Sequence, residues 1–197
     1  MKKISLLITI ALLIFLLSLV AQETGSFNDS RDGKSYRTVT IGTQTWMSEN
    51  LAYKTNSGCW AYENNISNVR KYGYLYDWKT AQSVCPPGWH LPIDSEWLTL
   101  MSFLGSGDIA GGKLKSTISW ESPNTGATNS SGFSALPSGA RFPNGSFDNA
   151  TGYCYWWRTK EYDTNHAYFI QLSYDQVRVS ENYNEKNAAV SIRCLKN

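Results

Sequence analysis

One short stretch of the chain, residues 85–97, contains most of the side chains that could do chemistry: Cys85, His90, Asp94 and Glu96. A cysteine activated by a histidine is a nucleophile, and a histidine beside carboxylates can act as a general acid or base. Two prolines separate Cys85 from His90, and the sequence shows no nucleophile beside the histidine. We therefore predict no catalytic residue and expect His90 to be a hydrogen-bonded structural histidine.

A second group of polar side chains offers the oxygen ligands that calcium prefers. Glu161, Asp163 and Asn165 occupy alternate positions, and Asp148 and Asn149 lie upstream. Calcium takes roughly six to eight such oxygens, whereas solvated polar residues are also ordinary in loops. We predict no metal and no cofactor, with calcium as the alternative.

Trp156 and Trp157 stand side by side, followed by Arg158. Neighbouring residues on a strand face opposite sides, so one ring could be exposed and stack on a sugar or grip a protein. The alternative buries both rings under the loops. The candidate ligand-binding residues are Arg141, Trp156, Trp157, Arg158, Glu161, Asp163 and Asn165.

Four cysteines are present: Cys59, Cys85, Cys154 and Cys194. An even number in an exported chain indicates two disulfides, and the sequence leaves three pairings open. No cysteine or histidine spacing suits a structural zinc site.

The N-terminal residues 1–21 are predicted to be a signal peptide, because Lys2 and Lys3 precede an apolar run and Ala21 precedes polar residues. An uncleaved membrane anchor is the alternative, and it would be the protein's one contact with a membrane. We expect residues 22–30 to be a short disordered lead-in and residues 31–197 to form one domain. The protein is then secreted, or lies at the cell surface or in the periplasm.

The net charge of the chain is +2, and no basic run follows Lys3. Nucleic acid is therefore not an expected partner. Aromatic residues make up 14% of the chain, a content that fits a compact extracellular domain with a carbohydrate-facing surface.

Strands are predicted at 36–41 and 44–47, and helices at 78–85, capped by Asp77, and at 94–104. The second helix should bury Trp97, Leu98, Met101 and Leu104. Glycine, serine and asparagine dominate residues 110–153, which we expect to be loops. Strands are expected again at 167–172, 177–180 and 189–195. This order predicts an α+β fold.

The chain resembles the Fibrobacter succinogenes major paralogous domain, a family of exported bacterial proteins, from about Arg31 to Asn197. The matching segments are DGKSYRTVTIGTQTWMSENL, YGYLYDWKTAQSVCPPGWHLPIDSEW, GGKLKS, SPNTGATNSSGFSALPSGAR, NGSF, YWWRTKEYDTNHAYF and VSIRCLKN. The resemblance implies a C-type-lectin-like fold, with two helices packed on a twisted antiparallel sheet and a long loop-rich region. That fold also houses formylglycine-generating enzymes.

The resemblance also implies a disulfide pairing, because lectin-like folds tie the first helix to the last strand. Cys85 would pair with Cys194, which leaves Cys59 with Cys154. Where relatives have a serine or threonine that caps the second helix, this chain has Ile93, so we expect Asp94 to be the cap.

The resemblance brings no settled activity. The expected function is an exported, non-catalytic binding module that contacts a glycan or a surface protein through loops between 110 and 165. An enzyme of the formylglycine-generating type and a purely structural surface component are the alternatives.

Overall fold

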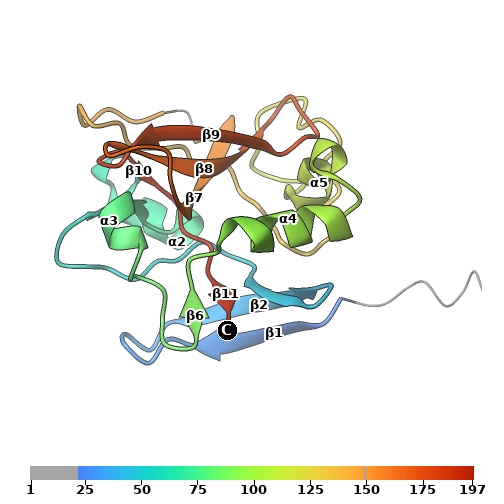
Figure 1. Cartoon of the computed structure of the whole chain (residues 1–197), viewed down its shortest axis with the longest axis horizontal. Coiled ribbons are helices and arrows are strands. Elements are labelled where there is room, and N and C mark those ends of the chain that lie inside the picture. The colour runs from blue at the N-terminus through green and yellow to red at the C-terminus, as the bar shows by residue number, and fades with distance from the viewer. Residues whose placement is uncertain (1–21, 149) are drawn as a thin grey trace, which may run out of the picture.

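The computed structural model describes residues 22–148 and 150–197. The predicted signal peptide, residues 1–21, lies outside the described residues. Within them no helix is both long and apolar enough to span a membrane. The fold is mixed α/β, with three antiparallel sheets and short helices between them (Figure 1).

The five-stranded sheet has the order β1-β2-β3-β11-β6 and joins the beginning of the described chain to its end. Its strands are β1 (Thr24–Asn28), β2 (Ser35–Ile41), β3 (Gln44–Met47), β6 (Trp89–His90) and β11 (Leu195–Lys196). The predictions of β2 and β3 are confirmed. The expectation of a disordered lead-in at residues 22–30 is wrong, because β1 pairs along β2 and Phe27 stacks on Trp89 with ring centroids 4.3 Å apart.

A small sheet of order β10-β5-β4 joins two strands from the middle of the chain to one near its end. It consists of β4 (Cys59–Trp60), β5 (Leu75–Asp77) and β10 (Ala189–Val190). Between β4 and β5 the chain forms the short helices η1 (Tyr62–Asn64), η2 (Ile66–Asn68) and α2 (Val69–Tyr72). The predicted single strand 189–195 is therefore two short strands in two different sheets.

Of the two predicted helices, the first is shorter than expected. Asp77 caps α3 (Trp78–Ala81) by accepting a hydrogen bond from the backbone N–H of Thr80 at 2.8 Å, but the helix ends after one turn. The predicted helix 94–104 is confirmed as α4 (Asp94–Phe103), although Leu98 is exposed and Leu100 takes its expected place in the core.

The cap of α4 differs from the prediction. Ile93, not Asp94, is the N-cap residue, and Asp94 begins the helix. The isoleucine side chain has no oxygen to accept a hydrogen bond, so only the glutamate half of a capping box remains. That half is the carboxylate of Glu96, which accepts a hydrogen bond from the backbone N–H of Ile93 at 2.8 Å.

The helix α5 (Gly107–Leu114) was not predicted, and its residues from 110 onward are expected from their glycine content to be loop. Two of these glycines allow close backbone contacts. A Cβ on Gly111 would lie 2.7 Å from the carbonyl oxygen of Val177, and one on Gly112 would lie 2.4 Å from that of Gly126. From Lys115 to Gly152, the described residues form loops and isolated bridges without a helix or a strand, as predicted.

The third sheet has the order β7-β8-β9 and consists of β7 (Tyr153–Glu161), β8 (His166–Ser173) and β9 (Ser180–Glu185). The prediction of β8 is confirmed. The strand expected at 177–180 is wrong, because the strand begins at Ser180 and continues to Glu185. Its sequence, SENYNE, is an exposed edge strand without the hydrophobic alternation by which strands are recognised.

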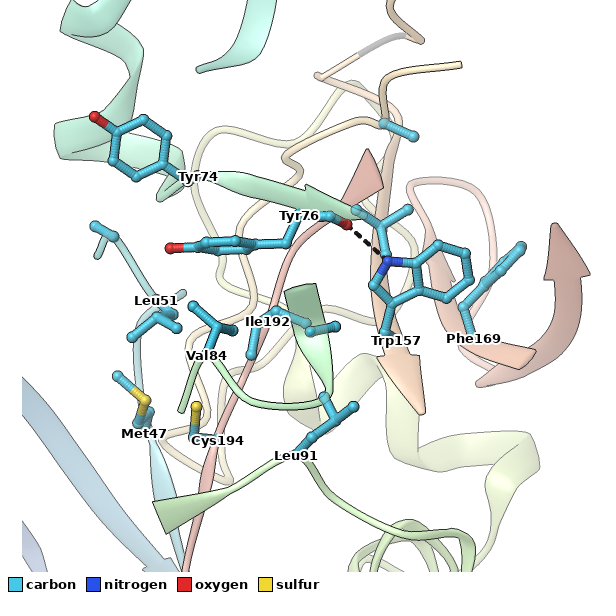
Figure 2. Packing of buried hydrophobic residues seen from close by; sticks show 14 of the residues in the cluster. Met47, Leu51, Tyr74, Tyr76, Val84, Leu91, Trp157, Phe169, Ile192 and Cys194 are labelled. Atoms are coloured by element: carbon cyan, nitrogen blue, oxygen red, sulfur yellow. Dashed lines mark hydrogen bonds between the residues drawn. The ribbon is translucent and has the colours of Figure 1, made fainter. Parts of the chain in front are cut away.

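Two hydrophobic clusters form the core. Figure 2 shows the first core cluster, in which Trp157 lies beside Phe169, and its indole N–H donates to the backbone carbonyl of Tyr76 at 2.7 Å. The second core cluster joins the five-stranded sheet, α4, α5 and β7–β8, and it contains Trp156. In Figure 1, α4 lies between the five-stranded sheet and the β7–β9 sheet.

Candidate functional site

Cys85 and Cys194 form a disulfide across 109 positions of sequence, as the resemblance implied. The bond ties the segment after α3 to the residue before β11, and so it fixes the beginning of the 85–97 stretch. Such a bond is consistent with an extracellular or periplasmic location.

Both ring nitrogens of His90 are hydrogen-bonded. Nδ1 lies 2.7 Å from Oδ1 of Asn197, and Nε2 lies 2.9 Å from Oε1 of Glu96. The Glu96 carboxylate also accepts the hydrogen bond that caps α4. The predicted hydrogen bonding of His90 is confirmed, and the network joins Asn197, β6 and α4.

The second predicted disulfide is absent, because Cys59 and Cys154 are both free thiols. Cys59 packs against the first core cluster, and Cys154 is a fully buried member of the second. Burial raises the pKa of the Cys154 thiol far above its ordinary value, which keeps it protonated and unreactive.

Neither tryptophan of the candidate set is exposed. Trp156 and Trp157 face opposite sides of β7, as expected of a strand, but each side is covered by one of the two core clusters. The proposed stacking of a ligand on either ring is therefore wrong. The alternative interpretation, in which both rings are buried, is confirmed.

Arg158, the next residue of the candidate set, is buried in an ion-pair network. Its Nε donates to Oδ1 of Asp94 at 2.7 Å and its Nη1 to Oε2 of Glu181 at 2.6 Å. Lys160 adds a second cation, 3.4 Å from the Asp94 carboxylate. The guanidinium of Arg158 thus bonds partners within the protein, and it links β7 to the first residue of α4 and to β9.

Arg141 lies in a different environment. Its guanidinium carbon is 4.5 Å from the centroid of the Trp60 ring, and its backbone pairs with Ala189. Its Nε is buried without a hydrogen-bond partner among the described residues. The structure therefore does not place Arg141 in contact with Arg158, Glu161, Asp163 or Asn165.

Three tyrosines that the candidate set omitted gather above Arg158. The rings of Tyr162 and Tyr183 stack with centroids 3.9 Å apart and planes 2° from parallel, and Tyr168 meets both edge-on. Tyr162 and Tyr183 remain 48% and 45% exposed. His166 lies against the same pair. We call Tyr162, Tyr168, Tyr183 and His166 the tyrosine surface.

Strand register explains why these rings meet. Tyr168 and Tyr183 are direct partners on β8 and β9, and Tyr162 lies in the turn that joins β7 to β8. Partners directly opposite on antiparallel strands place their side chains on the same face. Tyr168, Ile170 and Leu172 recur at every second position of the sequence, which is typical of one face of a strand. The strand β9 was not predicted, so Tyr183, the partner of Tyr168, could not be found.

The turn itself is ordered by Asp163. One carboxylate oxygen accepts hydrogen bonds from the backbone N–H groups of Asn165 and His166, and the carboxylate also bonds the His166 ring at 2.8 Å. These bonds hold the pKa of Asp163 below its usual value, the His166 ring having the largest effect. The hydroxyl of Tyr183 raises the pKa of Tyr162, chiefly through a side-chain hydrogen bond.

A polar hollow of about 420 Å³ adjoins the tyrosine surface and shares His166 with it. Its other lining residues carry amide, hydroxyl, carboxylate and ammonium groups: Thr164, Asn165, Glu185, Lys186 and Asn187. Lys186 donates to the carbonyl oxygen of Thr164 at 2.9 Å and lies 3.2 Å from the Glu161 carboxylate. Asn165 of the candidate set therefore lines the hollow, and Glu161 is held beside it.

The carboxylates considered for calcium already have partners within the protein. Glu161 pairs with Lys186 and Asp163 with His166, while Asp148 accepts a hydrogen bond from the Tyr155 hydroxyl. In the described part of the chain, no three His, Cys, Asp or Glu residues form a metal-binding group. Asn149 lies outside the described residues.

Comparisons with known proteins give one match. A family model described as the Fibrobacter succinogenes major domain matches residues 39–196. A search of curated proteins and a search of solved structures found no match.

Proposed function

The chain belongs to the Fibrobacter succinogenes major domain family, and we propose that it is an exported, non-catalytic module that binds a glycan through the tyrosine surface. One observation carries the proposal: a half-exposed aromatic pair adjoins a polar hollow, and His166 belongs to both. Large exposed aromatic groups are uncommon on a surface with no partner.

Sugars present apolar C–H faces and rings of hydroxyl groups, so their binding sites combine aromatic rings with fixed polar side chains. The paired rings of Tyr162 and Tyr183 supply the first element. The amides of Asn165 and Asn187, with Lys186 and Glu185, supply the second. The same arrangement favours a glycan over an extracellular protein, because a stable protein interface buries on the order of 800 Å² on each partner.

Two features support a non-catalytic role. An enzyme of the formylglycine-generating type would need a reactive pair of cysteines or a copper thiolate site. Cys85 is engaged in the disulfide with Cys194, while Cys59 and Cys154 lie in different parts of the core. His90, the other candidate for chemistry, has both nitrogens occupied by Asn197 and Glu96.

We further infer that the fold is C-type-lectin-like. The disulfide between the segment after α3 and the residue before β11, the antiparallel sheets and the long loop segment after α5 support this inference. An experimental structure superposed on known C-type-lectin-like domains tests it, and a different strand connectivity would refute it.

The binding proposal is tested by a glycan array on the exported full chain, followed by calorimetry on the glycans that bind. We expect Tyr162→Ala and Tyr183→Ala each to weaken binding about tenfold or more. Tyr174→Ala, a partly exposed tyrosine outside the surface, is the matched control and should bind normally. No binding to any glycan would remove this ligand class. Binding to an extracellular protein instead would support the protein alternative, and no ligand at all would support the structural component.

A further inference from the structure

A pocket of about 340 Å³ lies among β2, the residues that follow β3, α2 and the long loop segment. None of its lining residues belongs to the tyrosine surface or to the polar hollow. Its charged lining consists of four cations, Arg37, Arg70, Lys71 and Arg193, and one carboxylate, Glu49. Positive charge therefore converges on this pocket, although the chain as a whole is close to neutral.

Arg193 is a buried cation at this pocket, with a relative exposure of 1%. Neutral oxygens alone receive its hydrogen bonds: Oδ1 of Asn50 at 2.9 and 3.2 Å, and the carbonyl oxygens of Met47 at 3.2 Å and Phe133 at 2.5 Å. Burial lowers the pKa of Arg193 to about 9, so the side chain is still charged at neutral pH. Its charge is therefore buried without a carboxylate that accepts a hydrogen bond from it, and Glu49 acts on it only through space.

The outer cations have no anionic partner among the described residues, although the ammonium of Lys71 lies 4.8 Å from the centroid of the Tyr72 ring. Arg70 and Lys71 are consecutive, exposed residues on α2, and within the described chain neither they nor Arg193 forms an ion pair with a carboxylate. Like charges held together repel each other, which raises the free energy of the empty pocket. An anion in the pocket would relieve this repulsion.

The single carboxylate of the pocket is already engaged. Oε1 of Glu49 accepts a hydrogen bond from the backbone N–H of Arg37 at 2.7 Å and lies 3.8 Å from the Arg37 guanidinium. Glu49 therefore offsets Arg37 in part and also acts through space on Arg193, so one carboxylate faces four cations in this pocket. The hydroxyls of Ser48 and Ser116 line the same space and supply neutral hydrogen-bond donors.

We propose that this pocket binds a tetrahedral oxyanion, sulfate or phosphate. Guanidinium and ammonium groups are the side chains that recognise these anions most strongly, and serine hydroxyls complete such sites. The anion is either a free ion or an ester group on a polysaccharide, since both present the same oxygens. Arg70 and Lys71 contact it, while the buried charge of Arg193 adds to the attraction in a region of low dielectric.

Calorimetric titration of the exported full chain tests this proposal with inorganic sulfate, inorganic phosphate and a sulfated oligosaccharide, all at constant ionic strength set with sodium chloride. The double variant Arg70→Gln/Lys71→Gln should weaken binding at least about tenfold, because it removes two charge-assisted contacts. The matched control is Lys79→Gln/Arg178→Gln, which removes the same two residue types at exposed positions outside the pocket.

Saturable binding of inorganic sulfate or phosphate that the first variant loses and the control keeps supports a free ion as ligand. Binding of the oligosaccharide alone, with the same dependence on the variants, supports the ester group. Equal loss in both double variants would reduce the effect to unspecific charge attraction and overturn the proposal. Absence of binding by all three probes would overturn it as well. Neither result bears on the tyrosine surface, whose residues are unchanged.

Discussion

Arg158 and Arg193 are two arginines of the same burial in opposite electrostatic settings. Each has 3% or less of its surface exposed. Arg158 donates hydrogen bonds to two carboxylates, Asp94 and Glu181, whereas every hydrogen bond of the Arg193 side chain to a described residue goes to a neutral oxygen. The first charge is neutralised within the protein and supports the tyrosine surface. The second is left unbalanced at a pocket where further cations gather, so the two sites should favour ligands of different charge.

The largest loss of stability is expected from removing the disulfide between Cys85 and Cys194. Because Cys194 directly follows Arg193, the bond also holds the backbone of that arginine. Removing the bond with Cys85→Ala/Cys194→Ala should lower the free energy of unfolding by about 4–5 kcal/mol, the loop-closure cost for a loop of this length. Urea unfolding measures this loss. Binding of oxyanions should weaken with it, and a variant as stable as the wild type would contradict the account.

The two arginines themselves should differ in their contribution to stability. Arg193→Met leaves the carbonyl oxygens of Met47 and Phe133 buried without their donor, so we expect a loss of about 3 kcal/mol. Arg158→Met leaves Asp94 and Glu181, whose side chains are 30% and 43% exposed and can be solvated, so we expect about 1 kcal/mol. Urea unfolding of both variants measures the difference. Equal losses would show that the two settings are energetically equivalent.

The ion pair between Arg31 and Asp29 extends the comparison to the pH dependence of stability. Burial raises the pKa of Asp29, but hydrogen bonds from the side chain and backbone of Arg31 outweigh burial and leave it below the ordinary value of 3.8. The pair therefore stabilises the fold above about pH 4 and loses this contribution as the pH falls through the folded-state pKa.

We expect the unfolding temperature of Asp29→Asn to fall less steeply below about pH 4 than that of the wild type. The loss of stability in Asp29→Asn should be smaller than that in Arg193→Met, because Asp29→Asn removes only the ion pair with Arg31. Asp32→Asn, at an exposed position nearby, is the control and should keep the wild-type slope. Parallel curves for the wild type and Asp29→Asn would contradict the assignment.

The smallest effect is expected at Lys160, the exposed member of the Arg158 network. Its ammonium lies 3.4 Å from the Asp94 carboxylate and is 56% exposed, so water and salt screen the pair. Lys160→Met should change the free energy of unfolding by less than about 0.5 kcal/mol. A loss above 1 kcal/mol in urea unfolding would place Lys160 with Arg158 as a structural cation.

Local patterns predicted the elements with strong local signals. Alternation predicted β2 and β8, and the helical pattern predicted α4. Elements stabilised by contacts distant in sequence were missed. The β1 strand needs β2 and the ring of Trp89, and β9 is a polar edge strand that its register with β8 identifies.

The candidate site divides in the same way. Arg158, Glu161, Asp163 and Asn165 do lie beside or beneath the tyrosine surface and the polar hollow. Trp156 and Trp157 do not, because their exposure depends on what covers each face of β7, and two core clusters cover them. Tyr162 and Tyr183 are distant in sequence and come together only through the pairing of β8 with β9.

The sequence by itself determined the family and the mixed helix-and-strand class, since each rests on local composition or on a matching order of segments. The tertiary structure alone decided that Cys59 and Cys154 do not pair, which aromatic rings face solvent and which cations lack a hydrogen-bonded anion. These properties depend on distances between residues far apart in the chain. The unpaired Cys59 and Cys154, the stacked tyrosines and the unbalanced charge of Arg193 all follow from those distances.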